Sequence, residues 1–331
     1  MKKKSLFLAS AFLLIAGCSD DTNSSVVSQK FVHKYGFDLS EQEWGEREED
    51  GQIISMLKNG VKVTRSYENG TLHGPTTYTF PNSSVVEKIL VYDQGTLLKE
   101  VTQDPTGLPM REEVYEFDDR TIITLWDEKG APISIEEYDG EYLMEGKYYT
   151  ADHELEGQVL GGVGERVKRE RSGLLISRDG IDHGVMISRT SYHPSSLVHT
   201  ISHYDNYQLH GIQQKFTSTG KPLMDLHWNH GVLDGEKVIY RNGIKVAAVP
   251  YVNGQKNGLE THFDDLGNLT AEIEWKNDKK HGCSKLFTDE TIDEEWFYKG
   301  SAVSAQKFEM LTERAQMIAD FAIQKPVENS Q

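Results

Sequence analysis

A period of 23 or 24 residues runs through the C-terminal third of the chain. One aromatic column recurs at intervals of 24, 23, 24 and 23 residues: Tyr204, Trp228, Tyr251, Trp275 and Tyr298. A second aromatic column keeps the same steps: Phe216, Tyr240, Phe263 and Phe287. A glycine column does so too: Gly211, Gly235, Gly258 and Gly282. Three independent columns with one period predict an array of repeated folding units.

Each unit has the pattern of two short strands and two turns. From Leu269 to Trp275, apolar residues alternate with polar ones, as expected for a half-buried strand. Asn242-Gly243 and Asn253-Gly254 are strong hairpin signals, because both turn positions tolerate positive φ. The unit is therefore predicted to be a β-hairpin of about 23 residues, and successive hairpins pair antiparallel into a meander.

The N-terminal half repeats the pattern less regularly. Residues 67–74 (YENGTLHG) match residues 228–235 (WNHGVLDG) position for position. Weaker copies follow at residues 92–95, 138–140 and 179–184. Between 150 and 178 the register is lost, which predicts an irregular insertion or distorted hairpins. The array is therefore expected over residues 51–300, preceded by an N-terminal cap segment at residues 31–50.

The iterated motif, an aromatic residue followed by x-Asn-Gly-x-x-x-Gly, resembles the MORN repeat. More narrowly, it is similar to the variant in bacterial MORN-repeat antitoxins. The resemblance implies an all-β fold, an elongated and curved antiparallel meander, and a scaffold or binding role. It covers roughly residues 51–300, and the four units from 204 to 298 carry most of it.

The first 18 residues resemble the leader of a bacterial lipoprotein. Lys2 to Lys4 form a basic head, an apolar run too short to span a bilayer follows, and Ile15-Ala16-Gly17-Cys18 resembles a lipobox. This implies a signal peptide at residues 1–17, lipid and palmitate on Cys18, and a flexible tether at residues 18–30. The residue after Cys18, Ser19, resembles the signal for sorting to the outer membrane, although Asp20 fits it less well. An uncleaved signal anchor is the alternative, and it would need a longer apolar stretch.

The charge of the mature chain limits its partners. Removing residues 1–17 leaves 32 Lys and Arg against 52 Asp and Glu, a formal charge of −20. Such a surface repels nucleic-acid phosphates and anionic headgroups, so the membrane anchor must be the lipid on Cys18 and the expected partner is a basic protein. Lipidation would leave Cys283 alone, which excludes an intramolecular disulfide.

Several histidines occupy one position of the unit, directly before the second glycine. They are His73, His183, His210 and His281, and the equivalent residues elsewhere are Asp234 and Asn257. A row of metal ligands is one interpretation. His, Asn and Asp are also the residues that best tolerate left-handed turn conformations. We expect turn geometry, no metal and no cofactor.

Three other features have a chemical and a structural interpretation. The aromatic columns could form an exposed groove for a glycan or peptide, but we expect them to pack against one another across strands. The glycines of residues 157–164 precede Arg166, Lys168, Arg169 and Arg171, without the spacing of a phosphate loop. A solvated basic loop is expected there, pairing with the acidic surface or an anionic partner. Cys283 lacks the partners of a nucleophile and is expected to begin a strand.

The C-terminal segment, residues 301–324, has a helical pattern. Its apolar stripe consists of Phe308, Leu311, Ala315, Ile318 and Ala322. We expect this helix to cap the last strand of the sheet, whose edge would otherwise be open. Docking of the helix onto a partner protein is the alternative.

These observations favour a non-enzymatic lipoprotein of the outer membrane, facing the periplasm or the surface, whose repeat sheet binds a protein. The antitoxin resemblance implies a toxin or effector as that protein. A passive envelope spacer is the second hypothesis. An enzyme acting on envelope glycans is the third, and it predicts a cleft holding two carboxylates about 5–10 Å apart. No catalytic residue is predicted.

Overall fold

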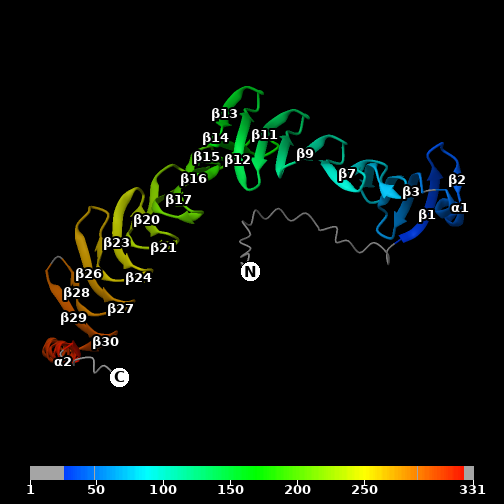
Figure 1. The fold of residues 1–331 in the computed structure, drawn as a ribbon. Helices are drawn as coiled ribbons and strands as arrows, with labels where there is room; N and C mark the ends of the chain where they lie inside the picture. Colours follow the sequence, from blue (N-terminus) through cyan, green and yellow to red (C-terminus); the bar gives the residue numbers. More distant parts are fainter. Residues whose placement is uncertain (1–25, 48, 289, 324–331) are drawn as a thin grey trace, which may run out of the picture. The chain divides into compact units, whose positions relative to one another are not determined.

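The computed structural model describes residues 26–47, 49–288 and 290–323, which contain 30 strands and two helices (Figure 1). Every strand pairing within the described residues is antiparallel and joins strands that are near neighbours in sequence. The predicted all-β meander with a C-terminal helix is therefore confirmed. The chain divides into two compact units, residues 1–107 and 108–331.

The described part of unit 1 contains eight strands and a short helix. They are β1 (Val26–His33), β2 (Asp38–Leu39), α1 (Glu41–Glu46), β3 (Gly51–Leu57), β4 (Lys62–Glu68), β5 (Thr71–Leu72), β6 (Gly74–Thr79), β7 (Val86–Asp93) and β8 (Thr96–Gln103). Ser40 caps α1 in a capping box with Glu43, and the buried Trp44 anchors it.

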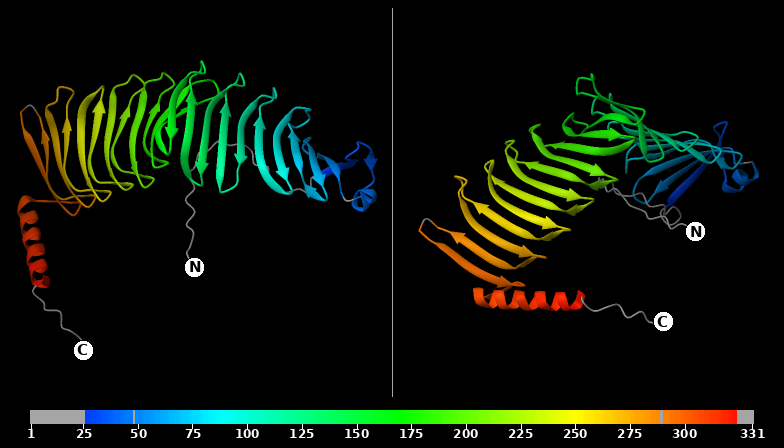
Figure 2. Two further views of the ribbon diagram at one scale, coloured as in Figure 1. Left: turned by 45° about the horizontal axis from the view of Figure 1, so that its top comes forward. Right: turned by 60° about the vertical axis from the view of Figure 1, so that its left-hand side comes forward.

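Unit 2 contains the remaining strands and the C-terminal helix. Its first half comprises β9 (Pro109–Tyr115), β10 (Arg120–Trp126), β11 (Pro132–Asp139), β12 (Tyr142–Tyr149), β13 (Leu155–Leu160), β14 (Val163–Arg169), β15 (Leu175–Asp182), β16 (Val185–Tyr192), β17 (Val198–Asp205), β18 (Gln208–Leu209) and β19 (Gly211–Phe216). Its second half comprises β20 (Pro222–Asn229), β21 (Val232–Leu233), β22 (Gly235–Arg241), β23 (Ile244–Val252), β24 (Gln255–Lys256), β25 (Gly258–Phe263), β26 (Leu269–Lys276), β27 (Lys279–Lys280), β28 (Gly282–Phe287), β29 (Ile292–Tyr298), β30 (Ser301–Val303) and α2 (Ala305–Ile323). Figure 2 shows these strands side by side, with α2 following the last of them.

Several predicted boundaries need correction. Strand β1 begins at Val26, so residues 26–30 are not part of a flexible tether. Residues 301–303 form β30, so the helix begins only at Ala305. Of the two predictions for segment 150–178, the irregular insertion is wrong and the distorted hairpins are found: β13 and β14 pair at only two positions, and the β12–β13 and β14–β15 pairings each contain a register shift. In the copy at 179–184, residues 179 and 180 lie within β15 and the turn is at His183-Gly184.

The repeat unit is a hairpin with a bulge near its turn. In one copy, Trp228 pairs with Leu233 of β21, and Asp225 on the same strand pairs with Val238 of β22. Three steps along β20 thus oppose five steps from Leu233 to Val238, so two extra residues form a bulge around Asp234 and Gly235. Its glycine, Gly235, has φ +119°, which only glycine adopts readily.

The turns are of the two-residue kind that the sequence predicts. Asn253 and Gly254 have φ of +48° and +80°, and Asn242 and Gly243 have φ of +53° and +88°. Positive φ at both central positions is the type I′ geometry that matches strand twist. These two hairpin predictions are confirmed.

The turns also connect successive units. The amide of Gly231 donates to the carbonyl of Leu209 (2.8 Å), and that of Gly254 donates to Leu233 (2.8 Å). The amide of Gly300 donates to Lys280 in the same way (2.9 Å). Each turn is thus hydrogen-bonded to the repeat before it. These bonds form a line along the side of the sheet on which the turns lie.

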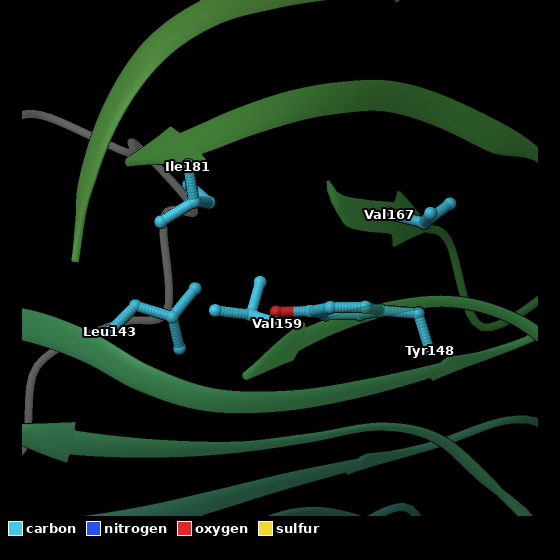
Figure 3. Close-up of a cluster of buried hydrophobic side chains, with 5 residues drawn as sticks. All are labelled: Leu143, Tyr148, Val159, Val167 and Ile181. Atoms are coloured by element: carbon cyan, nitrogen blue, oxygen red, sulfur yellow. The ribbon is translucent and has the colours of Figure 1, made fainter. Parts of the chain in front are cut away.

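The sheet bends sharply at β13 and β14. These strands pair at only two positions, Val159 with Gly164 and Leu160 with Val163, and β14 also contacts β11 and β12. Five buried side chains from β12 to β15 fill the bend, namely Leu143, Tyr148, Val159, Val167 and Ile181 (Figure 3). A Cβ at Gly157 would lie 2.8 Å from Val167, so only glycine permits this packing.

The turn glycine Gly184 provides a test of this packing. We expect Gly184→Ala to lower the free energy of unfolding by about 2–4 kcal/mol, because it combines left-handed strain with overpacking. The added Cβ would lie 2.7 Å from Tyr142 Cβ, at φ +75°. The matched control is Gly267→Ala, at φ +87° with no atom within 4 Å, which should cost only about 1–2 kcal/mol. Urea denaturation measures both, and equal losses would contradict the packing argument.

Candidate partner-binding surface

The glycine column lies directly opposite the first aromatic column. Gly211 pairs with Trp228, Gly235 with Tyr251, and Gly258 with Trp275. A Cβ at Gly235 would lie 2.9 Å from His227 and one at Gly258 would lie 3.2 Å from Pro250, so these glycines leave room for the residues that precede the rings of the first column. The two columns share a period because they are paired in backbone register.

The rings of the first column do not stack on one another, so that prediction is wrong. Among the described residues, no ring pair joins successive members from Tyr204 to Trp275. Lys256 instead covers Trp275, with its Nζ 4.3 Å from the ring centroid. All these rings are half-buried, and Trp275 is covered by a lysine from the preceding hairpin rather than by an aromatic neighbour.

The second aromatic column lies on the other face of the sheet. The hydroxyl of Tyr240 donates to Asp225 Oδ2 (2.8 Å), and Asp225 faces away from Trp228 because three residues separate them along one strand. Burial, and after it the hydrogen bond to Asp225, raises the pKa of Tyr240 to about 12. The columns therefore shield opposite faces and do not form one groove.

The last unit departs from the pattern. Phe297, not Tyr298, pairs with Gly282, because the β28–β29 pairing contains no bulge. Tyr298 consequently faces the other side, where its ring lies 6.1 Å from that of Phe308. The ring of Trp296 lies 5.2 Å from Phe308 on the same side. A missing bulge thus creates the site on which α2 packs.

Helix α2 covers the last strand less completely than the apolar stripe in its sequence predicts. Among the described side chains of α2, only Phe308 and Leu311 are half-buried. The Tyr298 hydroxyl donates to the Leu311 carbonyl (3.4 Å). Ala315 is exposed and Ile318 is 63% exposed, so the stripe does not continue as a packing face; the side chain of Ala322 lies outside the described ones. Met310 and Met317 are 57% and 65% exposed, which leaves apolar surface on α2.

The histidine column is not a column of left-handed turns, so that prediction is wrong. Only His183 has positive φ (+50°), whereas His73, His210, Asp234, Asn257 and His281 do not. Their amides instead close the bulge, as the Asp234 amide does by donating to the His227 carbonyl (3.0 Å). Across the described ranges no cluster of three potential ligands could hold a metal ion.

A different histidine position has a structural role that the sequence analysis missed. His227 Nδ1 donates to the Glu236 carbonyl (2.6 Å), and His203 Nδ1 donates to the Ile212 carbonyl (2.9 Å). In unit 1 the Ser66 hydroxyl makes the equivalent bond to Pro75 (2.9 Å). In the sequence, each of these donors directly precedes an aromatic residue of the repeat. Pro250 occupies that position in another copy and has no donor, so the pattern is not continuous along the chain.

The basic segment 166–171 is not a solvated loop. Arg166 lies on β14, and its guanidinium donates to both Glu136 oxygens (2.6 and 2.8 Å) and to the Tyr138 hydroxyl (2.9 Å). Tyr148 also donates to Glu136 (3.0 Å). Burial raises the pKa of Tyr138 and Tyr148, so both remain hydroxyl donors. The bend of the sheet brings these groups together.

The other arginines of the segment are also paired. Arg169 Nη2 donates to Glu156 Oε2 (2.9 Å), and this arginine holds the pKa of Glu156 below its usual range. Arg171 donates to the carbonyls of Trp126 (3.3 Å) and Asp127 (3.2 Å). Of the two predicted alternatives, pairing with the protein's own acids accounts for Arg166 and Arg169.

Cys283 lies on β28 and is half-buried. Its amide donates to Glu274 Oε2 (3.3 Å), and burial raises the pKa of its thiol. A raised thiol pKa disfavours the thiolate that nucleophilic chemistry requires.

The first half of β29 is an open, acidic strand edge. Residues 292–297 pair with β28 on one side, but β30 covers only Trp296–Tyr298 on the other. Ile292 is 58% exposed, and Asp293, Glu294 and Glu295 are also exposed. Within the described residues no strand pairs with the outer edge of residues 292–295. The backbone there can pair with another chain.

The chain matches no protein-family model, and no curated protein is significantly similar to it. Cys18 lies outside the described residues. The helices that the structure describes include none long and apolar enough to cross a membrane.

The buried pair Glu136–Arg166 can be tested by a double-mutant cycle. We expect Arg166→Met to lower the free energy of unfolding by about 3–5 kcal/mol, because it leaves the Glu136 carboxylate buried and unpaired. Adding Glu136→Gln should restore part of the loss. Urea denaturation of the single and double variants measures the coupling, and strictly additive losses would contradict the pairing.

Proposed function

We propose that this protein is a non-enzymatic scaffold that binds a basic protein segment at the open acidic edge of β29. The observation that carries the proposal is the combination of unpaired backbone and consecutive carboxylates at Asp293, Glu294 and Glu295. A segment that adds to this edge gains main-chain hydrogen bonds, and basic side chains on it meet the carboxylates. Binding of this kind is fast and salt-sensitive.

The surroundings of the edge support a partner that is amphipathic as well as basic. Ile292 at the start of β29 is exposed, and so are Met310 and Met317 of α2, which packs on β29 through Phe308. Methionine side chains adapt to varied apolar surfaces. Apolar anchors next to an acidic strand edge fit a strand with basic and apolar side chains.

The cellular role of the scaffold follows from the two sequence resemblances. The lipobox supports lipid attachment at Cys18 and a place at the outer membrane. The MORN-like motif supports an antitoxin- or immunity-type role, in which the basic partner is a toxin or effector. The anchor would hold the sheet at the membrane while the edge captures that partner.

A passive envelope spacer is the second candidate. The observation in its favour is the same set of carboxylates, because charges on an edge strand also prevent edge-to-edge aggregation. The two candidates differ in what crosslinking recovers: one basic protein for the scaffold, and only abundant envelope neighbours for the spacer.

Neutralising the edge tests the scaffold. We expect the triple variant Asp293→Asn, Glu294→Gln, Glu295→Gln to reduce capture of the basic partner at least tenfold in intact-cell crosslinking, because it removes the complementary charge. The control neutralises three exposed acids elsewhere in unit 2, Glu141, Asp152 and Glu154, and should capture normally. Equal capture by both variants, or no basic partner with the wild type, would refute the proposal.

Lipid attachment is tested separately. Cys18→Ala should move the protein from the membrane fraction to the soluble fraction, because the sulfur that carries the lipid is gone. Fractionation followed by immunoblotting measures this, with Cys283→Ala as the control that stays membrane-bound. A Cys18→Ala protein that remains in the membrane fraction contradicts the lipid anchor.

A further inference from the structure

Five polar residues form a line across one face of unit 2. Lys168 pairs with Ser177, Ser177 with Ser191, Ser191 with Thr200, and Thr200 with Lys215. Directly opposite residues of neighbouring antiparallel strands lie on one face. We call this line the hydroxyl row. With strands about 4.7–4.8 Å apart, its terminal lysines are about 19 Å apart at Cα.

The two lysines at its ends lack protein partners. Within the described residues neither Lys168 nor Lys215 has an ion pair or hydrogen bond, although both are half-buried. Nearby cations are satisfied: Arg189 donates to both oxygens of the fully buried Asp179 (2.8 Å each). A half-buried ammonium without a partner is costly, and an anion from outside the chain would satisfy it.

The positive charge around Lys168 exceeds the negative charge. Its pKa is lowered by burial and then by Arg166, and Arg189 lowers it further. Glu136 and Asp179 also face it, and each already pairs with an arginine. Three cations therefore share two carboxylates at this end of the row, which leaves a local positive charge in a strongly acidic protein.

The middle of the row has unused hydrogen-bonding capacity. The hydroxyls of Ser177 and Thr200 make no hydrogen bond within the described residues, and Ser191 makes only a long one to the Thr200 carbonyl (3.4 Å). A hydroxyl both donates and accepts. Ser177 is 2% exposed, so its hydroxyl lies below the longer side chains that surround it.

The row is confined to the strands β14 to β19. Beyond Lys215 the same line continues with Met224, Ile239 and Ala247, all apolar. Hydroxyls are therefore not the default at this position of the repeat.

We propose that the hydroxyl row is a binding site for an anionic oligosaccharide, which lies across the strands with acidic groups near Lys168 and Lys215. A sugar chain offers hydroxyl donors and acceptors between its charges, which matches three hydroxyls between two ammonium groups. A flat bilayer would not reach this site, since the residues of the row are buried or half-buried. The site is separate from the β29 edge and does not depend on the proposed function.

The test measures binding of an oligogalacturonate to the full mature chain by calorimetry. The wild type should bind it and should not bind a neutral maltooligosaccharide of equal length. Lys168→Met and Lys215→Met should each weaken binding at least tenfold, because each removes a charged hydrogen bond. Lys147→Met is the matched control, an exposed lysine that faces away from Tyr148 on β12, and it should bind normally.

Folding is controlled in the same experiment. Lys168→Met removes an unpaired, half-buried charge, so its midpoint of thermal unfolding should equal or exceed that of the wild type. Wild-type protein that fails to bind the probe overturns the site, as does undiminished binding by both lysine variants. Equal binding of an acidic peptide would overturn the saccharide assignment. Partner capture at the β29 edge should be unaffected by Lys168→Met, which separates this site from the proposed function.

Discussion

Backbone pairing between consecutive hairpins is the interaction on which the structure depends. Each unit of about 23 residues is too small to bury a core, so its half-buried rings need a neighbour. The neighbour supplies a glycine paired with Trp228 or Trp275, a lysine over the ring of Trp275, and a carbonyl for the turn amide. Stability is therefore shared between units and expected to depend on nearest-neighbour contacts.

The same constraint explains why the charged groups of unit 2 are so well paired. A sheet without a covering layer must satisfy polar side chains with those on neighbouring strands. Asp179 is fully buried and held by Arg189 from the next strand, while Glu136 is reached by Arg166 only because the sheet bends. Such networks specify one arrangement of strands when every member is satisfied. Lys168 and Lys215 are exceptions to this pairing, which is why they point to a ligand.

An open sheet offers two kinds of binding surface, and this chain has a candidate for each. The edge of β29 presents unpaired backbone next to carboxylates, which suits an extended basic segment. The face of β14 to β19 presents hydroxyls between cations, which suits a narrow anionic chain. Opposite charges at separate places allow both to be occupied together.

The sequence by itself determined the repeat, the strand alternation and the type I′ turns, because these follow from residues close together in the chain. Asn253-Gly254 requires no distant contact to form a turn, and its geometry is as predicted. The prediction of left-handed turns for the residues directly before the bulge glycines was wrong, since a two-residue bulge and a tight turn favour the same residue types. Bulge geometry appears only when the partner strand is known.

Tertiary structure decided what depends on register and on distant partners. One bulge fewer between β28 and β29 moved Tyr298 to the opposite face, because side chains alternate with a period of two. Arg166 finds its acid 30 residues earlier, across a bend that no local pattern encodes. The stripe of α2 remains largely exposed, since periodicity predicts a helix and its faces but not which neighbour covers them.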